Sequence, residues 1–151
     1  MNVLICPNLE KKEGLACARA ASETLLRLGA TPMADSAFGE ALGDLGVKLG
    51  GAGELLSRSD VIMPIGGDGT VMRAARFVAS SGKPILAVNA GRVGFLTQVE
   101  MHEIEQLRRL VEGSYTVHDR MMLEAWLEQG SGRRYIGLND IVISRGDFDK
   151  I

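Results

Sequence analysis

The chain has 151 residues, of which 46% are hydrophobic and 24% charged, and 17 Lys and Arg against 19 Asp and Glu give a formal net charge of −2. This length fits one domain with room for part of another, and the composition excludes a disordered, collagen-like or disulfide-dense chain. The near-neutral charge argues against a nucleic-acid binder, and no apolar run reaches the ~18 residues of a membrane span.

The first part of the chain predicts a buried strand followed by an amphipathic helix. Residues 2–6 are apolar throughout, as in a strand covered on both faces. Apolar side chains then recur at helical spacing over residues 12–28, and Gly29 follows as a helix-ending residue. Residues 36–57 are weakly helical and interrupted by glycines. We expect a mobile loop or short helices there.

Strands and helices continue to alternate in the middle of the chain. Residues 61–65 and 84–88 read as buried strands, and residues 70–80 and 102–112 as amphipathic helices. This alternation predicts an α/β fold with a parallel sheet covered on both faces. Ligands bind at the carboxyl ends of the strands in such sheets, where glycine-rich segments follow two of the predicted strands.

The pattern changes after residue 113. Residues 115–127 alternate apolar with polar side chains like a half-buried strand, and residues 135–144 predict a second strand after a polar turn. We therefore expect an α/β domain over 1–113, with phosphate-binding glycine-rich loops, and the opening β-hairpin of an all-β domain over 114–151. Two strands are marginal alone, so we expect that the sequence is incomplete or that an oligomer supplies the rest.

Four single residues carry further expectations. Cys6 and Cys17 lie in apolar or helical patterns without a CxxC motif, and we expect small buried hydrophobes. With no signal peptide at the start, these cysteines predict a cytoplasmic protein. His102 and His118 have no ligand spacing around them and read as surface residues rather than metal ligands.

Trp126 falls on the polar face of its predicted strand. A large aromatic side chain there is best explained by burial against another subunit or domain. We therefore expect a homo-oligomer.

The strongest motif is Gly66-Gly67-Asp68-Gly69-Thr70, between a predicted buried strand and a helix. Its glycines allow close backbone approach, and amides at a helix start suit a phosphate. Asp68 repels phosphate, so it holds a cation, accepts a proton or caps the helix. The segment is neither a Walker loop nor a Rossmann fingerprint, which have other glycine spacings.

Two weaker segments carry polar side chains. In residues 89–97, Asn89 is placed to hydrogen-bond a ligand and Arg92 to meet a phosphate, although a simple turn with Phe95 and Leu96 packing inward explains the segment as well. Asn139 and Asp140 interrupt an apolar run. A polar pair is costly to bury unpaired, so it faces solvent or binds a ligand such as a ribose.

Taken together, these segments resemble the NAD kinase family. The family pattern is a GGDGT loop, an N-x-G-x-x-GFLT segment and an Asn-Glu pair at the start of a β domain, matched here by residues 66–70, 89–97 and 139–140. Diacylglycerol and sphingosine kinases share GGDGT, and phosphofructokinases share it loosely. The second segment makes NAD kinase the better match.

The resemblance implies an α/β domain joined to a β domain, and a reaction that makes NADP from NAD with ATP or polyphosphate and Mg²⁺. Asp68 is the implied base on the 2′-hydroxyl of the adenosine ribose. The implied contacts to the donor or to NAD come from the other motif residues: Gly66, Gly67, Gly69 and Thr70 at the phosphates, Asn89 and Phe95 around NAD, and Asn139 and Asp140 at the nicotinamide-side ribose.

The sequence departs from the family pattern in two ways. Asp140 stands where the family usually has Glu, which shortens the side chain by one methylene. The family's later Gly/Ser/Thr-rich segment has no counterpart, so we expect the isolated chain to have little activity. A diacylglycerol-type lipid kinase and a non-catalytic NAD-binding module, in which Asp68 only caps a helix, remain as alternatives.

Overall fold

The structure is a computed structural model, and it describes residues 1–10, 12–91, 94–128 and 132–143. The chain divides into two compact units, Met1–Val117 and His118–Ile151, and each is described separately.

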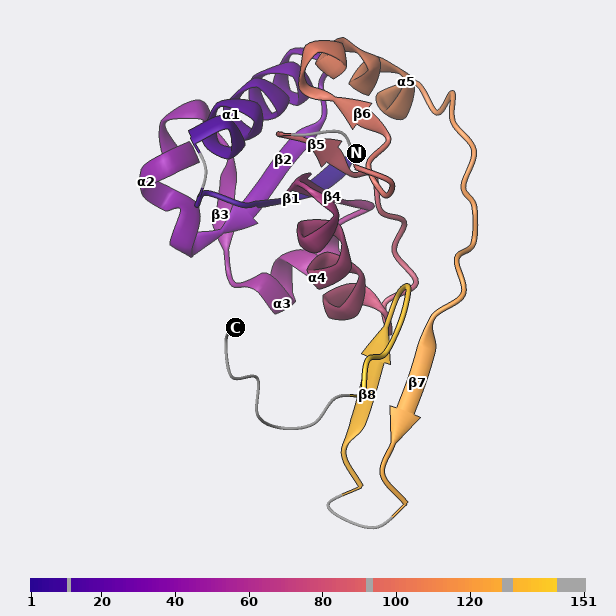
Figure 1. The fold of residues 1–151 in the computed structure, drawn as a ribbon. Coiled ribbons are helices and arrows are strands. Elements are labelled where there is room, and N and C mark those ends of the chain that lie inside the picture. Colours follow the sequence, from indigo (N-terminus) through magenta and orange to yellow (C-terminus); the bar gives the residue numbers. More distant parts are fainter. Residues whose placement is uncertain (11, 92–93, 129–131, 144–151) are drawn as a thin grey trace. The chain divides into compact units, whose positions relative to one another are not determined.

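The first unit is built on a six-stranded parallel sheet in the order β3-β2-β1-β4-β5-β6 (Figure 1). Parallel strands are typical of α/β proteins with both sheet faces covered. The predicted α/β class is confirmed. The strands are β1 Asn2–Pro7, β2 Thr31–Asp35, β3 Lys48–Gly50, β4 Val61–Gly66, β5 Val88–Asn89 and β6 Val99–Glu100.

The strand order reverses at the centre of this sheet. The chain adds β2 and β3 on one side of β1 and then places β4 on the other side, with Ile5 paired to Met63 and Pro7 to Ile65. Ligands in open α/β sheets bind where the order reverses, at the carboxyl ends of the strands. The ends of β1 and β4 are therefore the expected location of a ligand site.

Five α-helices and three short 3₁₀ segments connect the described strands. Helices α1 and α5 lie over one face of the sheet, and α3 and α4 over the other (Figure 1). The α-helices are α1 Lys12–Arg27, α2 Gly39–Leu42, α3 Ala52–Arg58, α4 Asp68–Val78 and α5 Leu107–Val111, and the 3₁₀ segments are Ser36–Phe38, Gly43–Leu45 and Met101–Gln106.

Each face of the sheet has its own apolar core. Val3 and Ile5 of β1 point into the core that α1 and α5 cover, whereas Leu4 points into the opposite core. Successive side chains of a strand point to opposite faces, so a strand buried on both faces must be apolar throughout. The second core contains Leu4, Met33, Leu55, Ile62 and Val78.

The two cysteines are free thiols in this unit. Cys17 is fully buried, as expected, whereas Cys6 is only half-buried, and that expectation is wrong. Burial raises the pKa of both thiols to about 11, with a smaller contribution from Asp35 at Cys6 and from Glu100 at Cys17. Both thiols are therefore protonated near neutral pH.

The predicted elements agree best with the structure at the sheet centre. The strand over 61–65 is β4, and the helix expected from residue 70 is α4, which begins two residues earlier. The strand expected over 84–88 is wrong, because only Val88–Asn89 pairs as a strand and Ile85 makes a single bridge to Ile62. The helix expected over 102–112 begins as a 3₁₀ segment.

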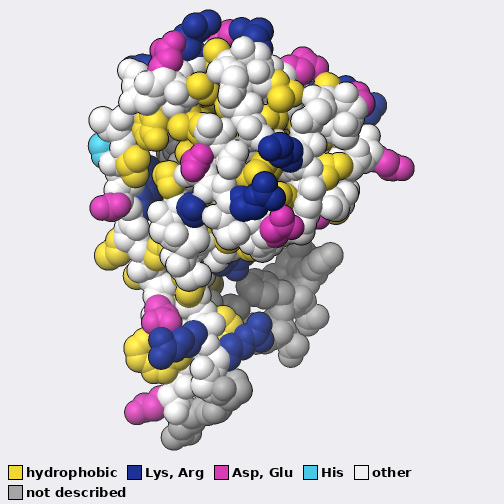
Figure 2. All heavy atoms as spheres, turned by 180° about the vertical axis from the view of Figure 1, so that it is seen from behind, with side chains coloured by type: hydrophobic (Ala, Val, Ile, Leu, Met, Phe, Trp, Pro, Cys, Tyr) yellow, Lys and Arg dark blue, Asp and Glu magenta, His cyan; other side chains and the backbone are white. Residues whose placement is uncertain are grey.

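The second unit contains an antiparallel pair, β7 Leu123–Trp126 and β8 Arg134–Gly137. Both strands are shorter than predicted, and part of the predicted turn and of the second strand lies outside the described residues. The expected half-buried alternation is wrong, because the side chains of both strands are mostly exposed. Figure 2 accordingly shows hydrophobic side chains at the surface of the hairpin, and Trp126 is 64% exposed.

Within the described part of the chain, none of the helices combines the length and the hydrophobicity that a membrane crossing requires. His102 and His118 are exposed, as predicted.

Candidate active site

The GGDGT turn joins β4 to α4 at the carboxyl edge of the sheet. Gly67 is the N-cap residue, with extended backbone and no side-chain cap, and Asp68 is the first helical residue. A Cβ atom at Gly66 would lie 2.4 Å from Thr70 Oγ1, so the turn has no room for a side chain there. The first amides of a helix lack intrahelical acceptors and carry positive partial charge. The turn therefore presents donors suited to an anion.

The Asp68 carboxylate binds the backbone of a second loop. Its Oδ2 accepts a hydrogen bond from the Phe95 amide at 3.1 Å, and its Oδ1 accepts one from the Leu96 amide at 3.0 Å. Asp68 therefore does not act as the helix cap that one alternative assumed. Each carboxylate oxygen has more than one acceptor site, so Asp68 can still receive a hydroxyl proton.

Gly94 makes this contact between the two loops sterically feasible. A Cβ atom at Gly94 would lie 2.4 Å from Asp68 Oδ1 and 3.3 Å from Thr97 Oγ1. Real Cβ atoms essentially never approach an oxygen to 2.4 Å. Any residue larger than glycine at position 94 would therefore displace the Asp68 carboxylate.

Asn89 is held inside the sheet edge rather than directed at open space. It is 1% exposed, and its Nδ2 donates to both carboxylate oxygens of Glu100 at 2.9 and 3.1 Å. Its Oδ1 accepts from the Gly91 amide at 3.1 Å. Asn89 and Glu100 face each other in the β5–β6 register, which explains the pairing.

Replacing Asn89 by Ala is expected to destabilise the first unit by about 2 kcal/mol, because the half-buried Glu100 carboxylate loses its donors. Chemical denaturation of Asn89→Ala, Glu100→Ala and the double variant measures the coupling between the two side chains. A coupling free energy near zero would contradict this structural role.

The other residues expected in the second motif have different environments. Phe95 is 96% exposed, whereas Leu96 is buried, so the alternative in which both pack inward is wrong for Phe95. Thr97 is half-buried, and its buried Oγ1 has no hydrogen-bond partner among the described residues. Arg92 lies outside the described residues.

Asn139 and Asp140 belong to the second unit. The prediction that they lie inside a strand is wrong, because β8 ends at Gly137 and both residues follow it with exposed side chains. Because both side chains are exposed, no free energy is lost by burying a polar pair without hydrogen-bond partners.

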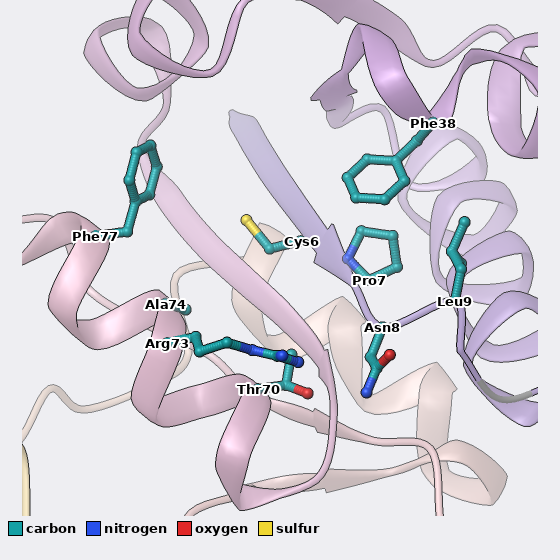
Figure 3. Close-up of a pocket in the computed structure, with 9 residues that line it drawn as sticks. All are labelled: Cys6, Pro7, Asn8, Leu9, Phe38, Thr70, Arg73, Ala74 and Phe77. Atoms are coloured by element: carbon teal, nitrogen blue, oxygen red, sulfur yellow. The ribbon is translucent and has the colours of Figure 1, made fainter. Parts of the chain in front are cut away.

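Sequence reasoning missed a pocket of about 370 Å³ beside the GGDGT turn (Figure 3). One end of β1 and one face of α4 form most of its wall. The sequence feature that could have indicated it is the helical spacing of four residues, which places them on one face of α4: Thr70, Arg73, Ala74 and Phe77. The remaining lining residues are Cys6, Pro7, Asn8, Leu9 and Phe38.

The described residues contain no group of three acidic, histidine or cysteine side chains able to hold a metal ion. Asp68 already accepts two amide hydrogen bonds in this structure. Mg²⁺ commonly binds through one or two carboxylates together with substrate phosphates. A single carboxylate such as that of Asp68 therefore fits a cation that arrives with a phosphate ligand.

The sequence matches one protein family, both by a family model and by similarity to individual relatives. The family model of the ATP-NAD kinase N-terminal domain matches residues 3–115. An NAD kinase of Thermoanaerobacter sp. strain X514 is 37% identical over 97% of this chain and 53% of its own length. An NAD kinase of Acetivibrio thermocellus is 36% identical over 100% of this chain and 53% of its own length. The chain thus spans about half the length of these relatives.

The fold is also shared with a solved structure. Yeast NADH kinase complexed with NADH superposes with a TM-score of 0.73 at 17% identity, covering 90% of this chain and 46% of that chain. These matches do not support the alternatives of a lipid kinase or a non-catalytic module. The family model covers most of the chain and the relatives align along nearly all of it, and the chain therefore belongs to the ATP-NAD kinase family.

Proposed function

We propose that this chain carries the phosphoryl-transfer site of an NAD kinase, which moves the terminal phosphoryl group of ATP to the 2′-hydroxyl of the adenosine ribose of NAD. The observation that carries the proposal is the Asp68 carboxylate at the start of α4, fixed by the amides of Phe95 and Leu96. It combines a proton acceptor with the anion-binding end of a helix. Family membership supports the same reaction.

In the proposed reaction the 2′-oxygen forms a bond to the terminal phosphorus while the bond from that phosphorus to the bridging oxygen breaks. The products are NADP and ADP. Asp68 takes the hydroxyl proton, and the first amides of α4 stabilise the charge on the transferring phosphoryl group. Phosphoryl transfer needs alignment and charge neutralisation more than covalent help, and a rigid strand–turn–helix unit supplies both.

The remaining site residues belong to the proposal in narrower roles. Gly66, Gly67, Gly69 and Thr70 contact phosphates, and Phe95 offers an exposed ring to NAD. Asn89 shapes the NAD side of the site through its bonds to Glu100 and Gly91. Arg92 meets a phosphate, and Asn139 and Asp140 bind the nicotinamide-side ribose.

A divalent cation, Mg²⁺ in the simplest case, supplies charge neutralisation when it is bound to the donor phosphates. Inorganic polyphosphate is the alternative donor to ATP. The reaction is placed in the cytoplasm, in line with the free thiols of Cys6 and Cys17.

We also propose that the protein forms a homo-oligomer through its second unit. The support is the exposed Trp126 on a pair of strands too small to be stable alone. Sedimentation velocity should show a species larger than the monomer, and Trp126 fluorescence should be blue-shifted within it. A stable monomer with a solvent-exposed Trp126 spectrum would contradict this assignment.

The proposed function is tested by NADP formation from NAD, ATP or polyphosphate, and Mg²⁺. Two proteins are compared, namely this chain and a chimaera that adds the remaining C-terminal part of the Thermoanaerobacter relative. NADP and ADP should form in equal amounts in at least the chimaera. If neither protein makes NADP although both are folded and the relative itself is active under the same conditions, the proposal is wrong.

A further inference from the structure

The loop that binds the Asp68 carboxylate has few main-chain hydrogen bonds of its own. Of the backbone hydrogen bonds that join described residues outside the helices and strands, none involves residues 94–97. The Phe95 side chain is 96% exposed, and Leu96 is buried without belonging to either apolar core of the sheet. Side-chain hydrogen bonds therefore decide where the two amides that bind Asp68 lie.

Gln98 makes two such hydrogen bonds. Its Nε2 donates to the Leu96 carbonyl oxygen at 2.6 Å, and its Oε1 accepts from the Ala87 amide at 2.8 Å. These partners define which way the Gln98 amide points, because a backbone N–H only donates and a carbonyl only accepts. Leu96 is therefore held at two points, by Asp68 at its N–H and by Gln98 at its carbonyl.

The other end of the Gln98 amide is fixed to the sheet. Ala87 is fully buried, and it directly precedes Val88, which pairs with Ile65 of β4. The Ala87 carbonyl also accepts the amides of Gln98 and Val99 at 3.0 and 3.2 Å. Since a buried N–H without an acceptor is costly, the Gln98 Oε1 satisfies a need of Ala87 that no neighbouring strand meets at this point. The side chain of Gln98 thus connects the loop to the centre of the sheet.

Together these bonds close a ring that includes the GGDGT turn. The ring starts at β4, returns to it through β5, and includes four residues in between: Asp68, Leu96, Gln98 and Ala87. Polar networks whose members are all satisfied are rigid. Thr97 adds nothing to this ring, because its Oγ1 has no hydrogen-bond partner among the described residues.

We propose that Gln98 is a positioning residue for phosphoryl transfer, which sets the direction of the Asp68 carboxylate through Leu96. The inference rests on the proposed kinase function and adds to it a residue that acts only through Asp68. A base must lie within hydrogen-bond reach of the proton it takes, and a small displacement of such a group costs much of the rate. Because Gln98 is exposed, its effect comes from its two hydrogen bonds and not from packing.

Amide hydrogen exchange of the 151-residue chain, followed by NMR, tests this placement without an activity assay. Gln98→Met keeps the length of the side chain but removes both hydrogen bonds. The amides of Phe95 and Leu96 should then exchange at least about tenfold faster, and the carboxyl carbon resonance of Asp68 should shift. Continued protection of Met63 in β4 shows that the variant is folded.

Gln106→Met is the matched control for this substitution. Gln106 is exposed, and no hydrogen bond joins its side chain to a described residue. Exchange at residues 95 and 96 and the resonance of Asp68 should stay as in the parent.

The rate of NADP formation by the chimaera gives the second readout. Gln98→Met should lower kcat by about 10–100-fold and change the KM for NAD by less than about twofold, because the placement of a base affects the chemical step rather than binding. This loss should disappear when residue 68 is already changed by Asp68→Asn. A role in stability alone would lower the rate by the same factor in both backgrounds, and Gln106→Met should lower neither.

The outcomes separate this inference from the proposed function. Unchanged exchange at residues 95 and 96 in a folded Gln98→Met chain, or equal rate losses in both backgrounds, would overturn the inference. NADP formation that depends on Asp68 but not on Gln98 would also overturn it and leave the kinase proposal intact. The expected exchange pattern without NADP formation by any chimaera would support the placement of Asp68 by Gln98 and overturn the kinase proposal.

Discussion

Replacing Asp68 by Asn in the chimaera is expected to lower the rate of NADP formation by about 10²–10⁴-fold, because the amide cannot accept the hydroxyl proton. The Asn side chain is nearly isosteric, but it offers one acceptor oxygen to two backbone amides, those of Phe95 and Leu96. A small loss of stability, of about 1 kcal/mol, should accompany the loss of rate. Coupled-enzyme assay and thermal unfolding measure the two effects separately.

Asp44→Asn is the matched control for this variant. Asp44 is an exposed carboxylate that pairs with Arg19 at 2.6 Å, and exposed pairs contribute little to stability. Its rate should equal that of the parent. A rate for Asp68→Asn within a few-fold of the parent would show that Asp68 positions the loop but does not take the proton.

Replacing Gly94 by Ala is expected to break the contact between the two loops. The new Cβ would lie 2.4 Å from Asp68 Oδ1, so the carboxylate must turn away from the amides of Phe95 and Leu96. We expect a loss of about 1–3 kcal/mol in the free energy of unfolding, together with a large loss of NADP formation. Amide hydrogen exchange at residues 95 and 96 should become faster than in the parent.

Gly91→Ala provides the stability control for Gly94→Ala. Gly91 is exposed in the same segment, its φ is not positive, and a Cβ there meets no atom of the described residues within 4 Å. This substitution should leave the free energy of unfolding nearly unchanged. If Gly94→Ala keeps protected amides at Phe95 and Leu96, the carboxylate contact is not what fixes this loop.

The sheet centre could be predicted from sequence because its strands are apolar on both faces. β1 and β4 satisfy that pattern, and the helical period of α4 follows a glycine-rich turn. β2 escaped prediction because Pro32 and Asp35 interrupt its apolar character, and β3 because it has only three residues. Both strands owe their conformation to parallel pairing with a neighbour rather than to their own sequence.

The opposite error occurred in the second unit. Alternation over residues 115–127 predicted a long half-buried strand, but only Leu123–Trp126 pairs with β8. Alternation identifies a face that can be buried, whereas strand length depends on a ladder partner along its full extent. The alternation therefore predicted an apolar face that the two paired strands alone do not bury.

In the candidate site, the motif identified Asp68 and the glycines, but not their contacts. Neither the bonds from Phe95 and Leu96 to Asp68 nor the Asn89–Glu100 pair could be predicted, because each joins residues far apart in the chain. The pocket was missed for a related reason. Its walls come from the end of β1, from Phe38 and from α4, which meet only after the sheet has formed.

The face of α4 that lines the pocket alternates two kinds of position. Thr70 and Ala74 are buried, whereas Arg73 and Phe77 are exposed on the same helix face. Substitutions at exposed positions usually change stability by less than about 0.5 kcal/mol. The lining of this pocket can therefore change at two surface residues while β4, the turn and the core stay intact, so related chains with one fold are free to differ in what the pocket accepts.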